Sequence, residues 1–130
     1  MTATERAREL AVIAAKAAYS KMATKVVALD VSERLVLTDV FLVASGANER
    51  QVSAIQDEIE YRLQEAGVKA VRREGTQQAR WVLLDFGEIV CHVQHEEDRE
   101  FYALERLWSD CPVIELPPDT DGAGPAPEPL

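Results

Sequence analysis

The sequence has little cysteine, no proline before position 112 and no long apolar run. Its 2 cysteines, Cys91 and Cys111, lack CxxC spacing, which excludes a disulfide framework and a zinc knuckle and fits a reducing compartment. No stretch approaches the roughly 18 uninterrupted apolar residues that a membrane-spanning helix requires. Charged residues stand near the N-terminus where a secretory signal peptide would be apolar. We therefore expect a cytoplasmic protein.

Length and composition favour a single domain. A hydrophobic content of 47% in 130 residues is enough for one continuous core, whereas two domains would each be too small. All 6 prolines lie at or beyond Pro112, and residues 117–130 contain almost nothing to bury. We expect one α/β domain over residues 1–116 and a disordered, proline-rich acidic tail over residues 117–130.

The negative charge is concentrated near the C-terminus. Residues 1–95 hold 13 acids and 12 bases, whereas residues 96–130 hold 10 acids and 2 bases. A negative surface repels phosphate backbones and attracts basic proteins, so this pattern predicts a basic protein partner and no direct readout of nucleic acid. Solubility alone explains the acidity equally well, and the charge does not separate the two explanations.

Helical spacing of apolar residues marks three segments. Thr2 and Glu5 have the spacing of a capping box and open a helix that should end near Met22. A second helix should run from a cap at Asn48 to a stop at Gly67. A third should begin at the acids of residues 96–98, which suit a helix N-terminus. Its predicted buried stripe consists of Phe101, Leu104 and Trp108.

Strand-like runs alternate with these helices. They cover residues 25–31, 35–46, 68–71, 81–86 and 88–95. Gly87 separates the last two, which predicts an antiparallel hairpin. The resulting order, α-β-β-α-β-β-β-α, favours a mixed sheet with helices packed on its faces.

The sequence does not favour a metal centre. Metal-ligating residue types cluster at Cys91, His92, His95 and Glu96. Alternation along a strand places Cys91 and His95 on one face and His92 on the other, so the group does not converge. A histidine satisfied within its strand is the better interpretation of this segment.

The two tryptophans receive different predictions. Trp81 follows the polar stretch EGTQQAR, so we expect it to be exposed, whereas Trp108 lies on an apolar helical stripe and should belong to the core. Tryptophan and tyrosine are enriched where protein partners are anchored. An exposed Trp81 would therefore favour a protein interface.

Two stretches resemble the conserved blocks of one known family. The stretch WVLLDFGEIVCHVQHEEDREFYALERLW, residues 81–108, resembles the signature of the ribosomal silencing factors, also called the Iojap family. The stretch TDVFLVASGANERQVSAIQDEI, residues 38–59, resembles their earlier block, and Glu74-Gly75 lies between the two. The resemblance covers about residues 5–110 and leaves the proline-rich tail outside.

The resemblance implies a translational repressor and not an enzyme. Members of this family bind the large ribosomal subunit through ribosomal protein L-fourteen and block its association with the small subunit, which lowers translation under nutrient limitation. They look like a nucleotidyltransferase fold without its catalytic residues. Here Asp39 and Asp85 stand alone, with no paired Asp-x-Asp to hold a catalytic magnesium. The resemblance also implies a homodimer off the ribosome, and it implies no cofactor.

Motif position identifies the implied partner-binding surface. It comprises Trp81, Asp85, His95, Glu96, Arg99, Tyr102 and Glu105. In such a surface an aromatic anchor supplies desolvated area, while acids meet a basic ribosomal protein and steer its approach.

Two alternative functions stay open on the sequence. A large-subunit assembly factor would share the same docking surface and differ only in timing. A nucleotide-binding enzyme would use the strand-to-helix junction at Ser45-Gly46, where free amides can receive a phosphate, although no glycine-rich phosphate motif accompanies it.

Overall fold

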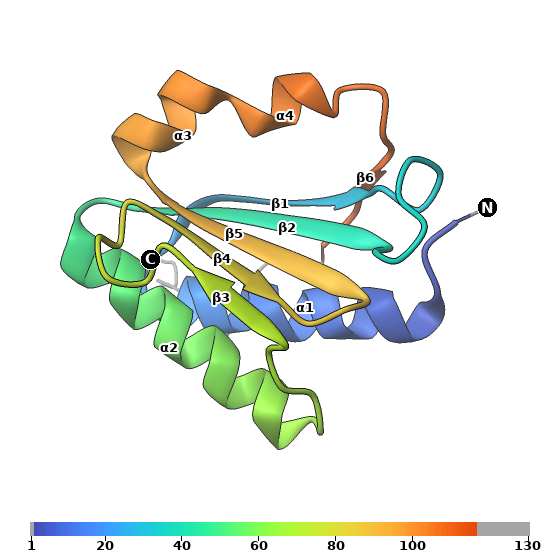
Figure 1. Cartoon of the computed structure of the whole chain (residues 1–130), viewed down its shortest axis with the longest axis horizontal. Coiled ribbons are helices and arrows are strands. Elements are labelled where there is room, and N and C mark those ends of the chain that lie inside the picture. Colours follow the sequence, from blue (N-terminus) through green and yellow to red (C-terminus); the bar gives the residue numbers. More distant parts are fainter. Residues whose placement is uncertain (1, 117–130) are drawn as a thin grey trace, which may run out of the picture.

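A computed structural model describes residues 2–116, which form an open six-stranded mixed sheet with helices on both faces (Figure 1). The strands are β1 (Thr24–Asp30), β2 (Val40–Gly46), β3 (Arg72–Glu74), β4 (Trp81–Asp85), β5 (Ile89–His95) and β6 (Val113–Ile114). The helices are α1 (Glu5–Ser20), α2 (Glu49–Glu65), α3 (Glu96–Tyr102) and α4 (Leu104–Leu107). The predicted fold class and element order are confirmed, while the predicted tail, residues 117–130, lies outside the described residues.

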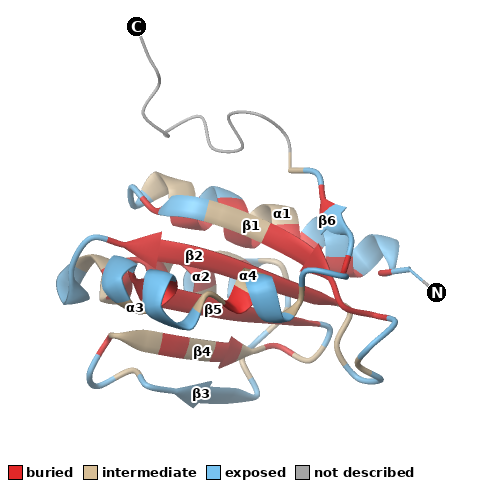
Figure 2. Ribbon diagram, turned by 90° about the horizontal axis from the view of Figure 1, so that it is seen from above, coloured by how far each residue is buried: buried red, intermediate tan, exposed pale blue. Residues whose placement is uncertain are grey.

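The sheet has the strand order β3-β4-β5-β2-β1-β6, with β2 and β5 parallel at its centre. The other neighbouring strands pair antiparallel. Helices α1 and α2 cover one face, and α3 and α4 cover the other (Figures 1 and 2). Every residue of β2 and β5 is buried, as expected for central strands covered on both sides.

Helix α1 begins two residues later than the predicted capping box. Thr4, and not Thr2, is the N-cap, and its Oγ1 accepts a hydrogen bond from the backbone N–H of Ala7 over 3.0 Å. The apolar residues at helical spacing in this segment, Ala3, Ala7, Leu10, Ala14 and Ala17, are all buried.

Helix α2 is capped at both ends as the sequence predicts. Asn48 accepts a hydrogen bond from the N–H of Gln51 over 2.8 Å, and Gly67, with φ of 90°, follows the last turn. The N–H of Val68 then bonds to the carbonyl of Leu63 over 2.9 Å, closing a Schellman motif. Because Val68 completes this cap, the strand predicted at residues 68–71 was placed too early, and β3 begins at Arg72.

The predicted hairpin of β4 and β5 is confirmed. Gly87, with φ of 91°, occupies the turn, and its N–H donates to the carboxylate of Asp85 over 2.8 Å. The register pairs Trp81 with Gln94 and Leu83 with His92, so β4 presents Trp81 and Leu83 to the face covered by α3.

Three further predictions need correction. Strand β2 begins at Val40 instead of residue 35, because residues 31–39 form a loop in which Leu37 is 85% exposed. The third helix breaks at Ala103, whose φ of 47° is left-handed, and this break separates α3 from α4. Phe101, which the predicted stripe placed in the core, is 80% exposed. The sequence also missed the short strand β6.

Candidate functional site

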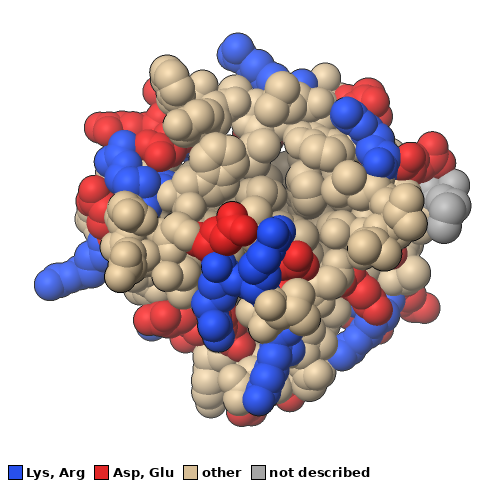
Figure 3. Space-filling model, viewed as in Figure 1, with Lys and Arg blue, Asp and Glu red and all other residues tan. Residues whose placement is uncertain are grey.

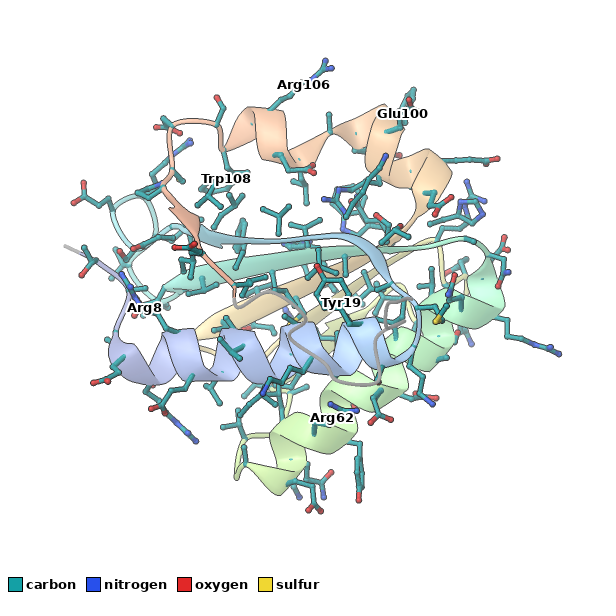
Figure 4. All side chains as sticks on the ribbon, turned by 180° about the vertical axis from the view of Figure 1, so that it is seen from behind. Arg8, Tyr19, Arg62, Glu100, Arg106 and Trp108 are labelled. Atoms are coloured by element: carbon teal, nitrogen blue, oxygen red, sulfur yellow. The ribbon has the colours of Figure 1, made fainter. Side chains whose placement is uncertain are left out.

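The face covered by α3 and α4 carries a small second core. Its buried residues are Leu29, Val31, Phe41, Val90 and Cys111. Trp108 packs against this cluster from the end of α4, with its ring edge-on to Phe41 and centroids 4.8 Å apart. Figure 4 shows Trp108 turned toward the sheet while Glu100 and Arg106 point away from it. The prediction that Trp108 belongs to the core is confirmed in this sense, although the ring stays partly exposed.

Aromatic rings form a continuous row across this face of the sheet. In order, the row consists of Trp108, Phe41, His92, Trp81, Tyr102 and Phe101. Successive centroids lie between 4.8 and 6.1 Å apart. The row starts in the second core and ends in solvent, so it connects the interior to the surface.

The exposed end of this row is the main surface feature of the face. Tyr102 is 48% exposed, Phe101 is 80% exposed, and Trp81 is half-buried between His92 and Tyr102. We call Trp81, Phe101 and Tyr102 the aromatic rim. Figure 3 shows an area without charged side chains between α3–α4 and the strands, with acidic and basic side chains around it. Trp81 is thus less exposed than the sequence predicts, yet one side of it reaches the surface.

Close backbone packing fixes the position of Trp81. A Cβ on Gly75 would lie 2.1 Å from the carbonyl oxygen of Trp81, and Gly75 has φ of 76°, so only glycine fits there. The N–H of His95 donates to the carbonyl of Arg80 over 2.7 Å, which pairs the chain just before β4 with the end of β5.

Arg99 is an internal residue and not a surface contact. It is 3% exposed, and its guanidinium donates to the hydroxyl of Ser45 over 2.7 Å and to the carboxylate of Glu105 over 2.8 and 2.5 Å. Burial, the largest single influence, would raise the pKa of Glu105, but the hydrogen bond from Arg99, a backbone hydrogen bond and the positive charges of Arg99 and Lys25 together hold that pKa below its usual range. Arg99 and Glu105 therefore clamp α3 and α4 onto the sheet, and this clamp places Tyr102.

Two more of the predicted contact residues have local structural roles. The Nδ1 of His95, which is 9% exposed, accepts from the N–H of Glu97 over 3.1 Å and so caps α3. Asp85 accepts from Gly87 in the hairpin turn and lies 3.7 Å from the guanidinium of Arg72. These side chains shape the surface more than they extend from it.

Acidic side chains surround the start of α3. Glu96 and Glu100 are exposed, and Glu96 accepts a hydrogen bond from the hydroxyl of Thr24 over 3.2 Å. Arg80 donates to Asp98 over 2.6 Å and to Glu97 over 3.2 Å. Arg80 offsets part of the acidity on one side, whereas Glu96 and Glu100 leave negative charge beside the aromatic rim.

The residues that the sequence suggested for a metal or a phosphate are separated from one another or already engaged within the described chain. Within residues 2–116 no group of three or more histidine, cysteine, aspartate or glutamate residues is placed to hold a metal ion. Cys91 packs in the core beneath α1 and α2, and His92 lies on the opposite face, as alternation predicts. At the Ser45-Gly46 junction, the N–H of Ala47 is taken by the side chain of Gln51 over 2.6 Å. Among the described helices, none is long and apolar enough to cross a membrane.

Burial keeps the strand side chains of this region uncharged. It lowers the pKa of His92 from 6.5 to about 4, so the imidazole is neutral at neutral pH. Burial likewise raises the pKa of the Cys91 thiol, which keeps the sulfur protonated and unreactive. The arrangement can therefore offer an aromatic and acidic surface, and it holds no activated nucleophile at Cys91.

The model of one protein family, described as ribosomal silencing factor during starvation, matches residues 4–128. The chain belongs to the ribosomal silencing factors. The match extends past the predicted limit near residue 110 and into the proline-rich tail, which corrects the expectation that the tail lies outside the family. Members of this family regulate ribosomes and are not known as enzymes.

Similar proteins cover nearly the same length. The ribosomal silencing factor of Halalkalibacterium halodurans is 44% identical over 109 residues, which is 84% of this chain and 93% of the relative. That of Bacillus subtilis is 41% identical over 104 residues, covering 80% and 88%. A crystal structure of a Chromobacterium violaceum protein superimposes with a TM-score of 0.76 at 34% identity, covering 78% of this chain and 85% of that one.

Three residues of this site were not predicted as site residues from the sequence of this silencing factor. Phe41 and His92 complete the ring row, and Arg80 joins the start of β4 to the acids of α3. The predicted hairpin could have indicated His92, because this residue stands diagonally across from Trp81 on the same face of the sheet. No local pattern pointed to Arg80.

Proposed function

We propose that this silencing factor represses translation by docking its aromatic rim on the large ribosomal subunit, through ribosomal protein L-fourteen. The bound protein then blocks association with the small subunit and lowers translation under nutrient limitation. The mechanism is occlusion in the cytoplasm and requires no catalysis and no cofactor.

The observation that carries this proposal is the half-exposed Trp81–Tyr102 pair beside the exposed carboxylates of Glu96 and Glu100. The two rings lie 4.8 Å apart, and Tyr102 is 48% exposed. Large aromatic side chains held at a surface are the usual anchors of protein interfaces. The exposed carboxylates of Glu96 and Glu100 complement a basic partner, as many ribosomal proteins are.

We also propose that two copies of the chain associate through the same surface when no ribosome is present. Phe101 and Leu107 are 80% and 67% exposed on the outer side of α3 and α4. An exposed apolar surface of this kind favours a partner. Because both contacts would use the aromatic rim, added large subunits should convert dimers into bound monomers, which sedimentation would detect.

Sedimentation of mixed ribosomal subunits tests the main proposal. Added protein should comigrate with large subunits and reduce the peak of joined particles, and Tyr102→Ala should weaken both effects. Tyr61→Ala is a matched control, since Tyr61 is a tyrosine 60% exposed on α2, on the opposite side of the molecule. Binding to large subunits without loss of the joined peak would contradict occlusion and favour an assembly role.

A further inference from the structure

His92 occupies the middle of the ring row, on the central strand β5. Its side chain is 6% exposed, meets Phe41 edge-on with centroids 4.9 Å apart, and lies with its centroid 6.1 Å from that of Trp81. The indole Nε1 of Trp81 donates a hydrogen bond to His92 Nδ1 over 3.1 Å. His92 therefore joins the buried part of the row to the aromatic rim.

This hydrogen bond fixes the protonation of the imidazole. A nitrogen that accepts a hydrogen bond carries no proton, so the proton of the neutral ring is on Nε2. Nε2 is buried and has no hydrogen-bond partner among the side chains and backbone of residues 2–116. An unpaired buried donor costs free energy that an apolar side chain of similar size would avoid. Packing alone would thus favour a leucine or phenylalanine at this position.

The hydrogen bond also selects one orientation of the indole. The terminal side-chain torsion of tryptophan is broad, so a half-turn of the ring keeps much of its shape but carries Nε1 to the other side. Only one of these orientations reaches His92 Nδ1. In that orientation the ring packs against Tyr102 of α3 with centroids 4.8 Å apart. The Trp81 ring is therefore held at its polar edge by His92 and across its surface by Tyr102.

We propose that His92 is a positioning residue, which holds the indole of Trp81 in a single orientation and so prepares the aromatic rim for docking. A side chain that is already ordered loses less conformational entropy on binding, and affinity rises accordingly. The docking half of this inference rests on the proposed function. The orientation of the indole is a property of the free protein and is measured without any partner.

A matched pair of substitutions, His92→Asn and His92→Leu, separates positioning from packing. Asparagine and leucine have similar shapes, but only asparagine places an acceptor oxygen near the position of Nδ1. The chain has 2 tryptophans, so NMR spectra contain two indole N–H signals, which Trp108→Phe assigns. The Trp81 N–H signal should keep its chemical shift and slow exchange with water in His92→Asn. In His92→Leu it should move to the position of a free indole and exchange quickly.

Of these two variants, His92→Leu should be at least as stable, whereas His92→Asn should bind large subunits more tightly. His92→Leu removes the unpaired donor and buries an apolar side chain, so it should melt at or above the temperature of His92→Asn. It should nevertheless bind large subunits about tenfold more weakly than the parent, whereas His92→Asn stays within about threefold. Val90→Ala is the control for stability, because Val90 lies on the same strand and face and is 7% exposed. It should lower the melting temperature and leave the indole signal and the affinity unchanged.

The outcomes distinguish this inference from the proposed function. Equal indole protection in His92→Asn and His92→Leu, or equal affinity of the two variants, would overturn the positioning role. If His92→Leu freed the indole but Trp81→Ala bound as tightly as the parent, the docking surface itself would be wrong. His92 would then orient a residue that takes no part in binding.

Discussion

The two faces of the sheet are built from different kinds of residues. Toward α1 and α2 the core is almost entirely alanine, leucine, isoleucine and valine, and it includes Leu42, Ile55 and Ile59, all 0% exposed. Toward α3 the buried residues include Ser45, Gln94 and Arg99, and both amide atoms of Gln94 have no hydrogen-bond partner within residues 2–116. The difference separates a face that stabilises the fold from a face that presents a surface.

Physical chemistry explains why these tasks are divided. Apolar burial is non-directional and stabilises in proportion to area, so the first face is built almost entirely from apolar side chains, with Gln56 as a buried polar residue of α2. The proposed docking surface instead needs side chains held in defined orientations, which the clamp of Arg99 on Glu105 and the hydrogen bond of Trp81 to His92 provide. Such contacts add little net stability, and the apolar face compensates for that.

The largest expected effect is on stability and comes from the apolar face. Ile59→Ala should lower the free energy of unfolding by about 2–5 kcal/mol, because truncation leaves a cavity in a packed core. Urea denaturation measures the loss. The folded fraction should still bind large subunits like the parent, and a parallel loss of affinity would show that the two faces are not separate.

Acidification should lower the folding stability through His92, which lies on the face covered by α3 and α4. The folded chain binds a proton at His92 less readily than the unfolded chain, because the pKa falls from 6.5 to about 4 on burial. Stability should therefore be complete above pH 6.5 and decline as pH falls toward 4, by roughly 3 kcal/mol in total. Denaturation curves across this range measure the slope.

The matched variant for this pH effect is His92→Leu, which has no group titrating at that position. Its stability should change much less over the same pH range. An unchanged slope would assign the acid sensitivity to other groups. Carboxylates such as Asp30, whose pKa lies below its ordinary value, lose their contribution only at lower pH.

Loss of the aromatic anchor should affect binding more than folding. Trp81→Ala should weaken binding to large subunits by about 2 kcal/mol, mainly through faster dissociation. Its melting temperature should fall less than that of Ile59→Ala, since Trp81 is only half-buried. Dissociation rates from immobilised large subunits provide the measurement, and parental rates would remove Trp81 from the docking surface.

The smallest expected effect concerns the acids beside the aromatic rim. Replacing Glu96 and Glu100 with glutamine should slow association and make it less sensitive to salt, with a loss of affinity below about 1 kcal/mol. Glu65→Gln, an exposed acid at the end of α2, is the control and should leave the association rate unchanged. A uniform effect of all three substitutions would indicate net charge in place of local steering.

Local patterns in the sequence were enough to predict most of the helices and strands. The stripe of α2, its cap at Asn48 and its stop at Gly67 were predicted, because helix periodicity and capping depend on neighbours a few residues apart. The β4–β5 hairpin followed from Gly87 for the same reason. Errors occurred where a cap or a loop used residues that had strand-like composition, as at residues 35–39 and 68–71.

The candidate site was predicted in part. The motif at residues 81–108 identified Trp81 and Tyr102, and both belong to the aromatic rim. It also named Arg99 as a contact, yet Arg99 is buried and one of its partners is Ser45, which lies 54 positions away along the chain. No local pattern reports which long side chain folds inward against a distant strand.

The sequence by itself determined the fold class, the alternation of β5 and the family, because each is written in short-range periodicity or in contiguous motifs. Only the tertiary structure decided which residues of the motif face the solvent. The break at Ala103 separates the exposed Phe101 from the buried Leu104, and the pairing of β2, β5 and β4 brings Phe41, His92 and Trp81 into one row. Side-chain exposure depends on contacts between segments far apart in the chain, and those contacts exist only once the sheet and its covering helices have assembled.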